Sequence, residues 1–251
     1  MPHHIAEKNA NGSVREFDDV KEIPAHGSTG KKVAEKLHRA GLFGTGCLEK
    51  ETFLRQHGET PEEQELVAAK LMGRWRSGAP LVLAPDKDDP ALGADMQRNN
   101  NFNYKEMDPH GYAVPLGAHI RRMNPRDTAA NINRRQMIRR GGTYGPPLPE
   151  GKPEDGVERG IAAFIGCASL LRQFEFAQNV WINDRNFHEL GNERDPLIGT
   201  QDGTLEFKIP KRPIRKTIKG LPAFTTVRGG AYFFLPGLKA LRYLAALGDK
   251  L

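Results

Sequence analysis

A histidine and a pair of arginines are the residues of this chain best suited to chemistry. His119 lies in the sequence Gly-Ala-His-Ile-Arg-Arg-Met-Asn-Pro-Arg, residues 117–126, and a second basic cluster ends in Arg139 and Arg140. A neutral imidazole binds a metal through one ring nitrogen while the other nitrogen donates a hydrogen bond. A guanidinium stays charged and presents a fixed fork of donors, which suits it to stabilise charge on an oxygen. Both residue types also occupy ordinary core and surface positions, so their types alone leave the two interpretations open.

The segments before and around these residues predict a helix, a long loop and a strand. Thr60-Pro61-Glu62-Glu63 is a capping box with proline at the first helical position, and the apolar stripe after it ends near residues 73–78. Residues 79–103 are rich in Pro, Asp and Asn, which predicts a long loop of the kind that serves a site or wraps a partner. Residues 136–140 are expected to form a short strand that leads into a glycine turn.

The C-terminal part has the clearest pattern. Residues 160–167 form an apolar run of strand length, and apolar residues from Leu170 to Trp181 predict a helical face. Residues 223–227 and 231–235 are expected to be two strands, followed by a closing helix opened by Pro236. Strands interspersed with helices predict an α+β fold, with helices packed on one face of an antiparallel sheet.

Charge and cysteine content constrain the function classes. The net charge of +6 comes partly from a basic run at residues 208–219, which Pro210 and Pro213 interrupt. No nucleic-acid-binding motif accompanies the run, so a solvated surface loop is the favoured interpretation and a polyanion contact the alternative. The only cysteines, Cys47 and Cys167, are too few for a disulfide framework, which favours a reducing compartment.

Residues 1–59 are weakly patterned and are interpreted as an N-terminal extension or an incomplete half domain. Only residues 31–40 within them suggest a short helix. We expect residues 60–251 to form the main domain. No signal peptide and no run of about 18 apolar residues is visible, which predicts a cytoplasmic protein that does not contact a membrane.

Seven segments of the chain resemble successive signatures of the dye-decolorizing peroxidase family, in the family's order. Together they extend over about residues 60 to 247, and the ordered set is far more specific than any one segment. The segments are residues 66–75, 77–80, 117–127, 138–141, 173–176, 195–199 and 228–237.

The resemblance implies a fold, a cofactor and roles for three residues. The family has two ferredoxin-like α+β halves with haem b (iron protoporphyrin IX) between them, and this chain resembles the second half of that dimeric α+β barrel-type fold plus its connector. By resemblance, His119 corresponds to the iron ligand and Arg139 to the arginine on the opposite face of the haem, with Arg140 as second choice. Asp195 is a candidate for the carboxylate that accepts a hydrogen bond from the other nitrogen of His119, although a turn before Pro196 also explains it.

The implied activity is oxidation of phenolic or dye-like donors by hydrogen peroxide, so peroxide and small aromatic reductants are the expected small-molecule partners. The family's GxxDG segment, whose aspartate moves a proton on peroxide, is not found in residues 1–118. Residues 199–203 fit the pattern, but their position after His119 favours Asp202 as an ordinary turn residue.

Three functions therefore remain open. The first is a peroxidase, either as the C-terminal part of a longer protein, with a complementing N-terminal half or a second copy as partner, or with residues 1–59 as a divergent cover in which Asp18, Asp19 or another carboxylate replaces the missing acid; truncation is the favoured interpretation. The second is a haem-binding module with little or no catalysis, because the acid is absent. A basic nucleic-acid-binding domain is a third and less favoured function.

Overall fold

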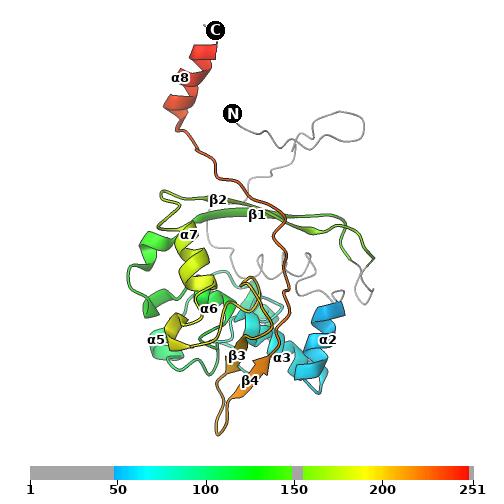
Figure 1. The fold of residues 1–251 in the computed structure, drawn as a ribbon. Helices are drawn as coiled ribbons and strands as arrows, with labels where there is room; N and C mark the ends of the chain where they lie inside the picture. Colours follow the sequence, from blue (N-terminus) through cyan, green and yellow to red (C-terminus); the bar gives the residue numbers. More distant parts are fainter. Residues whose placement is uncertain (1–47, 149–154, 249–251) are drawn as a thin grey trace.

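The structure is a computed structural model, and it describes residues 48–148 and 155–248 (Figure 1). The described residues combine helices with antiparallel strands, which confirms the predicted α+β class, but the strands form two separate hairpins instead of one sheet. The helices are α2 (Leu48–His57), α3 (Pro61–Met72), α4 (Pro90–Ala94), α5 (Tyr104–Met107), α6 (His119–Met123), α7 (Phe174–Phe176) and α8 (Leu238–Gly248). The strands are β1 (Ile138–Tyr144), β2 (Gly160–Gly166), β3 (Glu206–Ile209) and β4 (Lys216–Lys219).

Helix α3 begins and ends where the sequence predicts. Thr60 accepts a hydrogen bond from the backbone N–H of Glu63, and Gly73 ends the helix at a φ of 95°, a left-handed conformation that glycine adopts without strain. Helix α2 was not predicted, because its residues lie within the weakly patterned N-terminal segment. It packs beside α3 and buries Phe53 and Leu54 in a common hydrophobic cluster.

The basic run at residues 208–219 consists of the ends of two paired strands and the exposed turn between them, so the predicted surface loop is only partly correct. Strands β3 and β4 pair antiparallel, with Phe207 opposite Ile218. Both of these side chains are buried in the cluster beneath α2 and α3, whereas Lys216 and Lys219 are exposed. The alternation of apolar and basic residues is typical of a half-buried strand, and this periodicity outweighs the two prolines in the connecting turn.

The long segment 79–103 is ordered and contains only the short helix α4. Its residues Leu81 and Leu92 are buried in a second hydrophobic cluster with Trp75. The guanidinium of Arg74 donates to the backbone carbonyls of Gly78 and Asn99, each at 2.8 Å. A buried arginine therefore closes this segment into a compact unit that flanks the region before His119.

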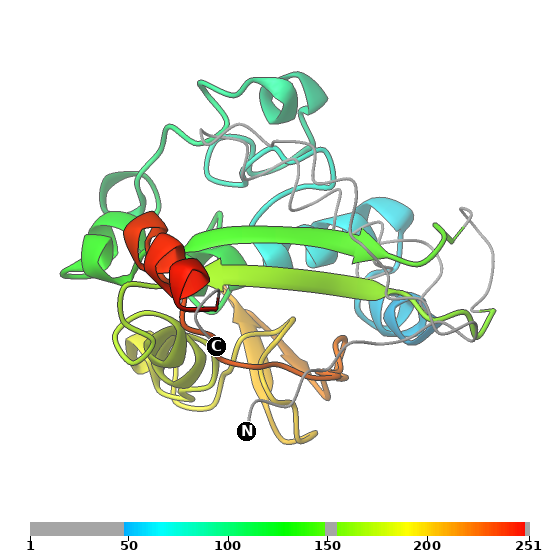
Figure 2. The same cartoon turned by 90° about the horizontal axis from the view of Figure 1, so that it is seen from above.

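Strands β1 and β2 form a two-stranded ribbon that lies across the body of the molecule, as Figure 2 shows from above. Strand β2 lies where the apolar run predicts. Strand β1 begins two residues later than predicted and continues through Gly141 and Gly142, which are paired within the ladder instead of forming a turn. Apolar side chains on the ribbon remain exposed, notably Ile138 and Phe164.

The helical face predicted after β2 is partly correct. Helix α7 continues as a π-helical segment, η3 (Ala177–Ile182), whose Trp181 and Ile182 are buried. Leu171, which the pattern placed on the buried face, is exposed. Short 3-10 turns occur at η1 (Arg126–Thr128), η2 (Ile132–Arg135) and η4 (Phe187–Glu189).

The C-terminal segment differs most from the prediction. Residues 223–227 and 231–235 form no strand, and α8 projects away from the body instead of closing it (Figure 1). Phe233 and Phe234 are 83% and 87% exposed. These residues favour strand structure, but a strand is stable only when a neighbour takes up its backbone hydrogen bonds and covers its apolar face. We call residues 222–248 the C-terminal arm. None of the described helices is long and apolar enough to cross a membrane.

Candidate functional site

The centre of the candidate site is a hydrogen bond between His119 and Asp195, which are 76 positions apart in the chain. His119 is the first residue of α6, and its Nδ1 lies 2.8 Å from Oδ2 of Asp195. The Asp195 side chain is fully buried, while the His119 side chain is 13% exposed. Because the carboxylate faces Nδ1, this nitrogen carries the proton in the neutral ring, and Nε2 is left with a lone pair.

Asp195 is held in place by its own turn. Its Oδ1 accepts the backbone N–H groups of Leu197 at 2.9 Å and Ile198 at 3.0 Å. Burial favours the neutral acid, but the electrostatic attraction of the His119 ring and these hydrogen bonds outweigh it and lower the pKa of Asp195. The carboxylate is therefore ionised at neutral pH, as an acceptor for the imidazole requires. The turn before Pro196 and the contact with His119, which were separate interpretations of Asp195, are both present.

Arg122 joins the two segments that carry His119 and Asp195. Its side chain is fully buried and stacks on the ring of Phe187, with the guanidinium carbon 4.8 Å from the ring centroid. It donates to the carbonyls of Gly117, Trp181, Asp184 and Glu193, at 2.8 to 3.2 Å. The sequence showed Arg122 beside His119 but gave no sign of its burial, because all of its acceptors but one come from distant backbone.

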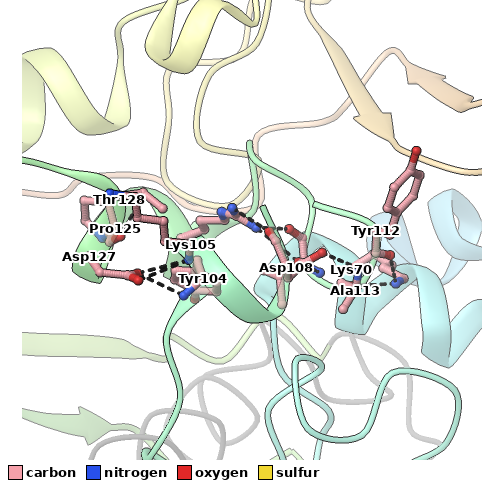
Figure 3. A network of polar contacts seen from close by, with 11 residues as sticks. Lys70, Tyr104, Lys105, Asp108, Tyr112, Ala113, Pro125, Asp127 and Thr128 are labelled. Carbon is pink, nitrogen blue, oxygen red and sulfur yellow. Dashed lines mark hydrogen bonds and ion pairs between the residues drawn. The ribbon is translucent and has the colours of Figure 1, made fainter. Parts of the chain in front are cut away.

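A second buried arginine fixes the segment that enters α6. Arg121 donates to Oδ2 of Asp108 at 3.1 Å and to the carbonyl of Val114 at 2.9 Å. Asp108 also accepts the N–H groups of Ala113 and Val114, and Lys70 of α3 donates to the carbonyl of Ala113 (Figure 3). Asp127 holds the other end of this network through the backbone N–H of Tyr104. The backbone on both sides of α6 is therefore anchored before any ligand binds.

The apolar residues on either side of His119 pack into the core. Val114 and Ala118 belong to the hydrophobic cluster that contains Trp75, and Ile120 packs against that cluster. This packing helps to hold the backbone of the His119 turn in place.

Arg139 and Arg140 lie on β1, and no hydrogen bond joins either of them to His119 or Asp195 among the residues that the structure describes. In the register of the ribbon Arg139 is opposite Ile165 and Arg140 is opposite Phe164. Because neighbouring strand residues point to opposite faces, the two guanidinium groups belong to different faces of the ribbon.

The two faces of the ribbon differ in their surroundings. Ile165, opposite Arg139, is half-buried, whereas Phe164, opposite Arg140, is 54% exposed. Arg139 is itself accessible, yet desolvation by the surrounding protein lowers the pKa of its guanidinium. Arg139 therefore lies on the more enclosed face of the ribbon.

Asp202 occupies an exposed turn. It forms an ion pair with Arg185 at 2.6 Å and accepts the N–H and hydroxyl of Thr204. This is the ordinary turn role expected for it. In the described part of the chain no group of three His, Cys, Asp or Glu residues is placed to hold a metal ion.

Comparison with known proteins identifies the class to which this fold and site belong. No protein-family model matches the chain. It is 35% identical over 200 residues to the dye-decolorizing peroxidase msp1 of Mycetinis scorodonius, and the matched region covers 71% of this chain and 38% of that protein. It is also 35% identical over 233 residues to a dye-decolorizing peroxidase of Mycena epipterygia, and the matched region covers 77% of this chain and 44% of the relative.

Solved structures give the same result. The dye-decolorizing peroxidase of Auricularia auricula-judae matches with a TM-score of 0.62 and 28% identity, over 72% of this chain and 46% of that one. A dye-decolorizing peroxidase in complex with 2,6-dimethoxyphenol matches with a TM-score of 0.59 and 29% identity, over 70% of this chain and 43% of that one. The fold is therefore the α+β, ferredoxin-like fold of these peroxidases.

The chain belongs to the dye-decolorizing peroxidase family and corresponds to the C-terminal half of its members. It spans less than half the length of the relatives named above. The resemblance found in the sequence is thus confirmed.

Proposed function

We propose that this chain supplies the histidine side of a haem b site in a peroxidase of the dye-decolorizing type. The observation that carries the proposal is the bond of 2.8 Å between Nδ1 of His119 and the buried, ionised Asp195. A histidine that binds iron needs one defined tautomer, and a carboxylate behind the ring raises the electron density at the other nitrogen. The residues present therefore fit a haem whose iron binds Nε2 of His119.

Each residue of the site has a distinct task in this proposal. His119 binds and orients the cofactor, and Asp195 holds the proton on Nδ1. Arg139, on the more enclosed face of the ribbon, is our first choice for the cation that stabilises negative charge on peroxide oxygen, and Arg140 is the second. Bound haem b would supply the iron chemistry by which hydrogen peroxide is reduced and a phenolic or dye-like donor is oxidised.

A haemin titration tests the ligand assignment. Adding haemin to the purified chain should give a Soret band that saturates near one equivalent, and His119→Ala should shift or weaken that band. His110→Ala is the matched control, because His110 is exposed. Identical spectra for the wild type and His119→Ala, at equal haemin occupancy, would remove His119 as the ligand.

An alternative function is haem binding with little or no catalysis. Asp202, in the GxxDG-like segment at residues 199–203, is in an exposed turn and paired with Arg185, which does not suit it to proton transfer at a haem. Stopped-flow mixing of the haemin-loaded chain with peroxide separates the two functions. A rapid spectral change that Arg139→Ala slows would support peroxidase chemistry and reject the inert module. No spectral change would support the module.

We propose that the exposed apolar ribbon and C-terminal arm are covered by a domain equivalent to the part of the relatives that this chain does not match. The chain covers 38% to 44% of those relatives, and Phe233, Phe234 and Phe164 are all exposed on it. Contiguous exposed apolar surface marks an interaction site.

Co-expression with the unmatched half of the Mycena epipterygia relative should yield a complex, and Phe233→Ser with Phe234→Ser should weaken it. A stable dimer of the chain alone, unaffected by that half, would favour a second copy as the partner.

A further inference from the structure

Glu193 is a fully buried carboxyl group whose two oxygens accept no hydrogen bond from any residue in the described ranges. Lys208 Nζ forms an ion pair with its Oε1 at 3.6 Å, a distance too long for a hydrogen bond, and donates a hydrogen bond to the carbonyl of Leu190 at 2.7 Å. An unsatisfied buried carboxyl is costly, and a carboxylate in this position would be costlier still. The position therefore calls for an explanation other than stability.

The carboxyl of Glu193 lies against the turn that presents His119. A Cβ atom added at Gly117 would be 2.4 Å from Oε2 of Glu193, so the carboxyl occupies the space of the missing side chain. Gly117 does not adopt a positive φ, so its backbone conformation would accept alanine, but the new methyl group would require the Glu193 carboxyl to move. Glycine at position 117 and the acid at position 193 are thus complementary in shape.

The backbone of Glu193 is tied to the same turn. Its carbonyl accepts a hydrogen bond of 2.8 Å from Arg122, whose Nε also donates to the carbonyl of Gly117 at 3.2 Å. Asp195 follows two residues later, and its N–H donates to the carbonyl of Ile182 at 2.8 Å. The side chain of Glu193 thus lies against the His119 turn, and its main-chain carbonyl is linked to the same turn by Arg122. Glu193 is also only two residues before Asp195 in the sequence.

The charged groups around Glu193 come from two elements. Burial is the largest effect on the pKa of Glu193 and raises it to about 7, although Lys208 of β3 and Arg122 of α6 lower it. The side chain is therefore largely neutral in mildly acidic solution, which reduces the cost of its burial. A neutral acid and a glutamine have nearly the same shape, and this similarity provides a conservative variant.

We propose that Glu193 is a positioning residue, whose buried carboxyl against Gly117 sets the spacing between the His119 turn and the Asp195 turn and so maintains their hydrogen bond. The inference deepens the proposed function, since it concerns the same histidine, but its geometry does not depend on haem. Without the carboxyl, a void would lie beside a glycine, which is the residue least able to resist a backbone shift.

The test is proton and nitrogen NMR of the haem-free chain, which reports the Nδ1–H of His119 directly. A proton held by a buried carboxylate exchanges slowly with water and should give a downfield resonance below pH 7, assigned by its loss in His119→Ala. We expect Glu193→Gln to keep this resonance and Glu193→Ala to lose or shift it. Leu71→Ala, at a buried position of the cluster under α2 and α3, is the matched control that destabilises the fold and keeps the resonance.

A double substitution keeps the test decisive if Glu193→Ala alone does not fold. Gly117→Ala should disturb the resonance by steric conflict, and Gly117→Ala combined with Glu193→Ala should restore it, because the new methyl group fills the vacated space. An unchanged resonance in Glu193→Ala, or no restoration in the double variant, would overturn the proposal. Failure of the proposed function would look different, since the resonance would respond as described while haemin did not bind to His119.

Discussion

The two sides of the candidate haem site differ in how completely this chain builds them. Around His119 the polar groups are buried and mostly paired: Asp195 accepts three hydrogen bonds and Arg122 donates four. The ribbon of β1 and β2 and the C-terminal arm, by contrast, expose apolar side chains, including Phe164 and Phe233. Among the described residues, the polar groups around His119 are thus buried and hydrogen-bonded, whereas the ribbon that carries Arg139 and Arg140 exposes apolar side chains.

The two regions thus differ in the number of buried polar contacts that hold them in place. The contacts that fix His119 are made by α6, the segment before it and the Asp195 turn, all within one body. The ribbon holds Arg139 through pairing with only one other strand. We therefore expect ligand binding at His119 to survive changes that abolish chemistry at the arginine face.

The largest expected change in the free energy of unfolding comes from replacing Arg122, and Arg140 on the ribbon provides the comparison. Arg122→Ala removes four hydrogen bonds to buried carbonyls and should lower the free energy of unfolding by at least about 3 kcal/mol. Arg140→Ala, on the exposed face of the ribbon, should change it by less than about 0.5 kcal/mol. Urea denaturation followed by circular dichroism measures both. Equal losses for the two variants would contradict the distinction between the sides.

A somewhat smaller change in the free energy of unfolding is expected as the pH is raised from 4.5 to 7. The pKa of Glu193 is raised by burial from 4.5 to about 7, so the folded state binds this proton more tightly than the unfolded state. The stabilisation is complete below the unfolded pKa and is lost as pH rises through the folded pKa, by on the order of 3 kcal/mol. Glu193→Gln should remove this part of the pH dependence between pH 4.5 and 7. Denaturation curves at several pH values measure it, and parallel profiles for both proteins would show that Glu193 is ionised throughout.

The smallest effect on stability is expected at the arm. Phe233→Ser with Phe234→Ser should leave the urea midpoint nearly unchanged, within about 0.5 kcal/mol, because both rings are exposed. The same change should reduce self-association in sedimentation velocity experiments. A large loss of stability would instead show that the arm packs on the body of the isolated chain in solution.

The sequence predicted the helix α3 and the strand β2 well, because a capping box and a continuous apolar run are local signals. It did not predict α2, whose apolar residues Phe53 and Leu54 acquire their role only by packing beside α3. The prediction of strands at residues 223–227 and 231–235 is wrong for the opposite reason. Their composition favours a strand, but in the described structure no neighbouring strand pairs with them.

The site itself was predicted only through the ordered motifs. Spacing alone cannot pair His119 with Asp195 across 76 positions. The resemblance supplied His119, and Asp195 was a candidate because a metal-binding histidine needs an acceptor for its other ring nitrogen. Glu193 was missed because it lies in the polar sequence Gly-Asn-Glu-Arg-Asp, residues 191–195, which is typical of exposed loops. Its burial follows from the packing of β3, α6 and the Asp195 turn, and no local pattern encodes that packing.

Resonance Raman spectroscopy of the ferrous haemin-loaded chain tests the central claim most directly, because the iron–histidine stretching band reports the ligand and its hydrogen bond together. We expect a strong band in the wild type that is absent in His119→Gly and returns when imidazole is added. We also expect a shift to lower frequency in Asp195→Asn, because a weaker acceptor behind the ring leaves less electron density at Nε2. A band of unchanged frequency and intensity in His119→Gly without added imidazole would contradict the assignment of His119 as the iron ligand.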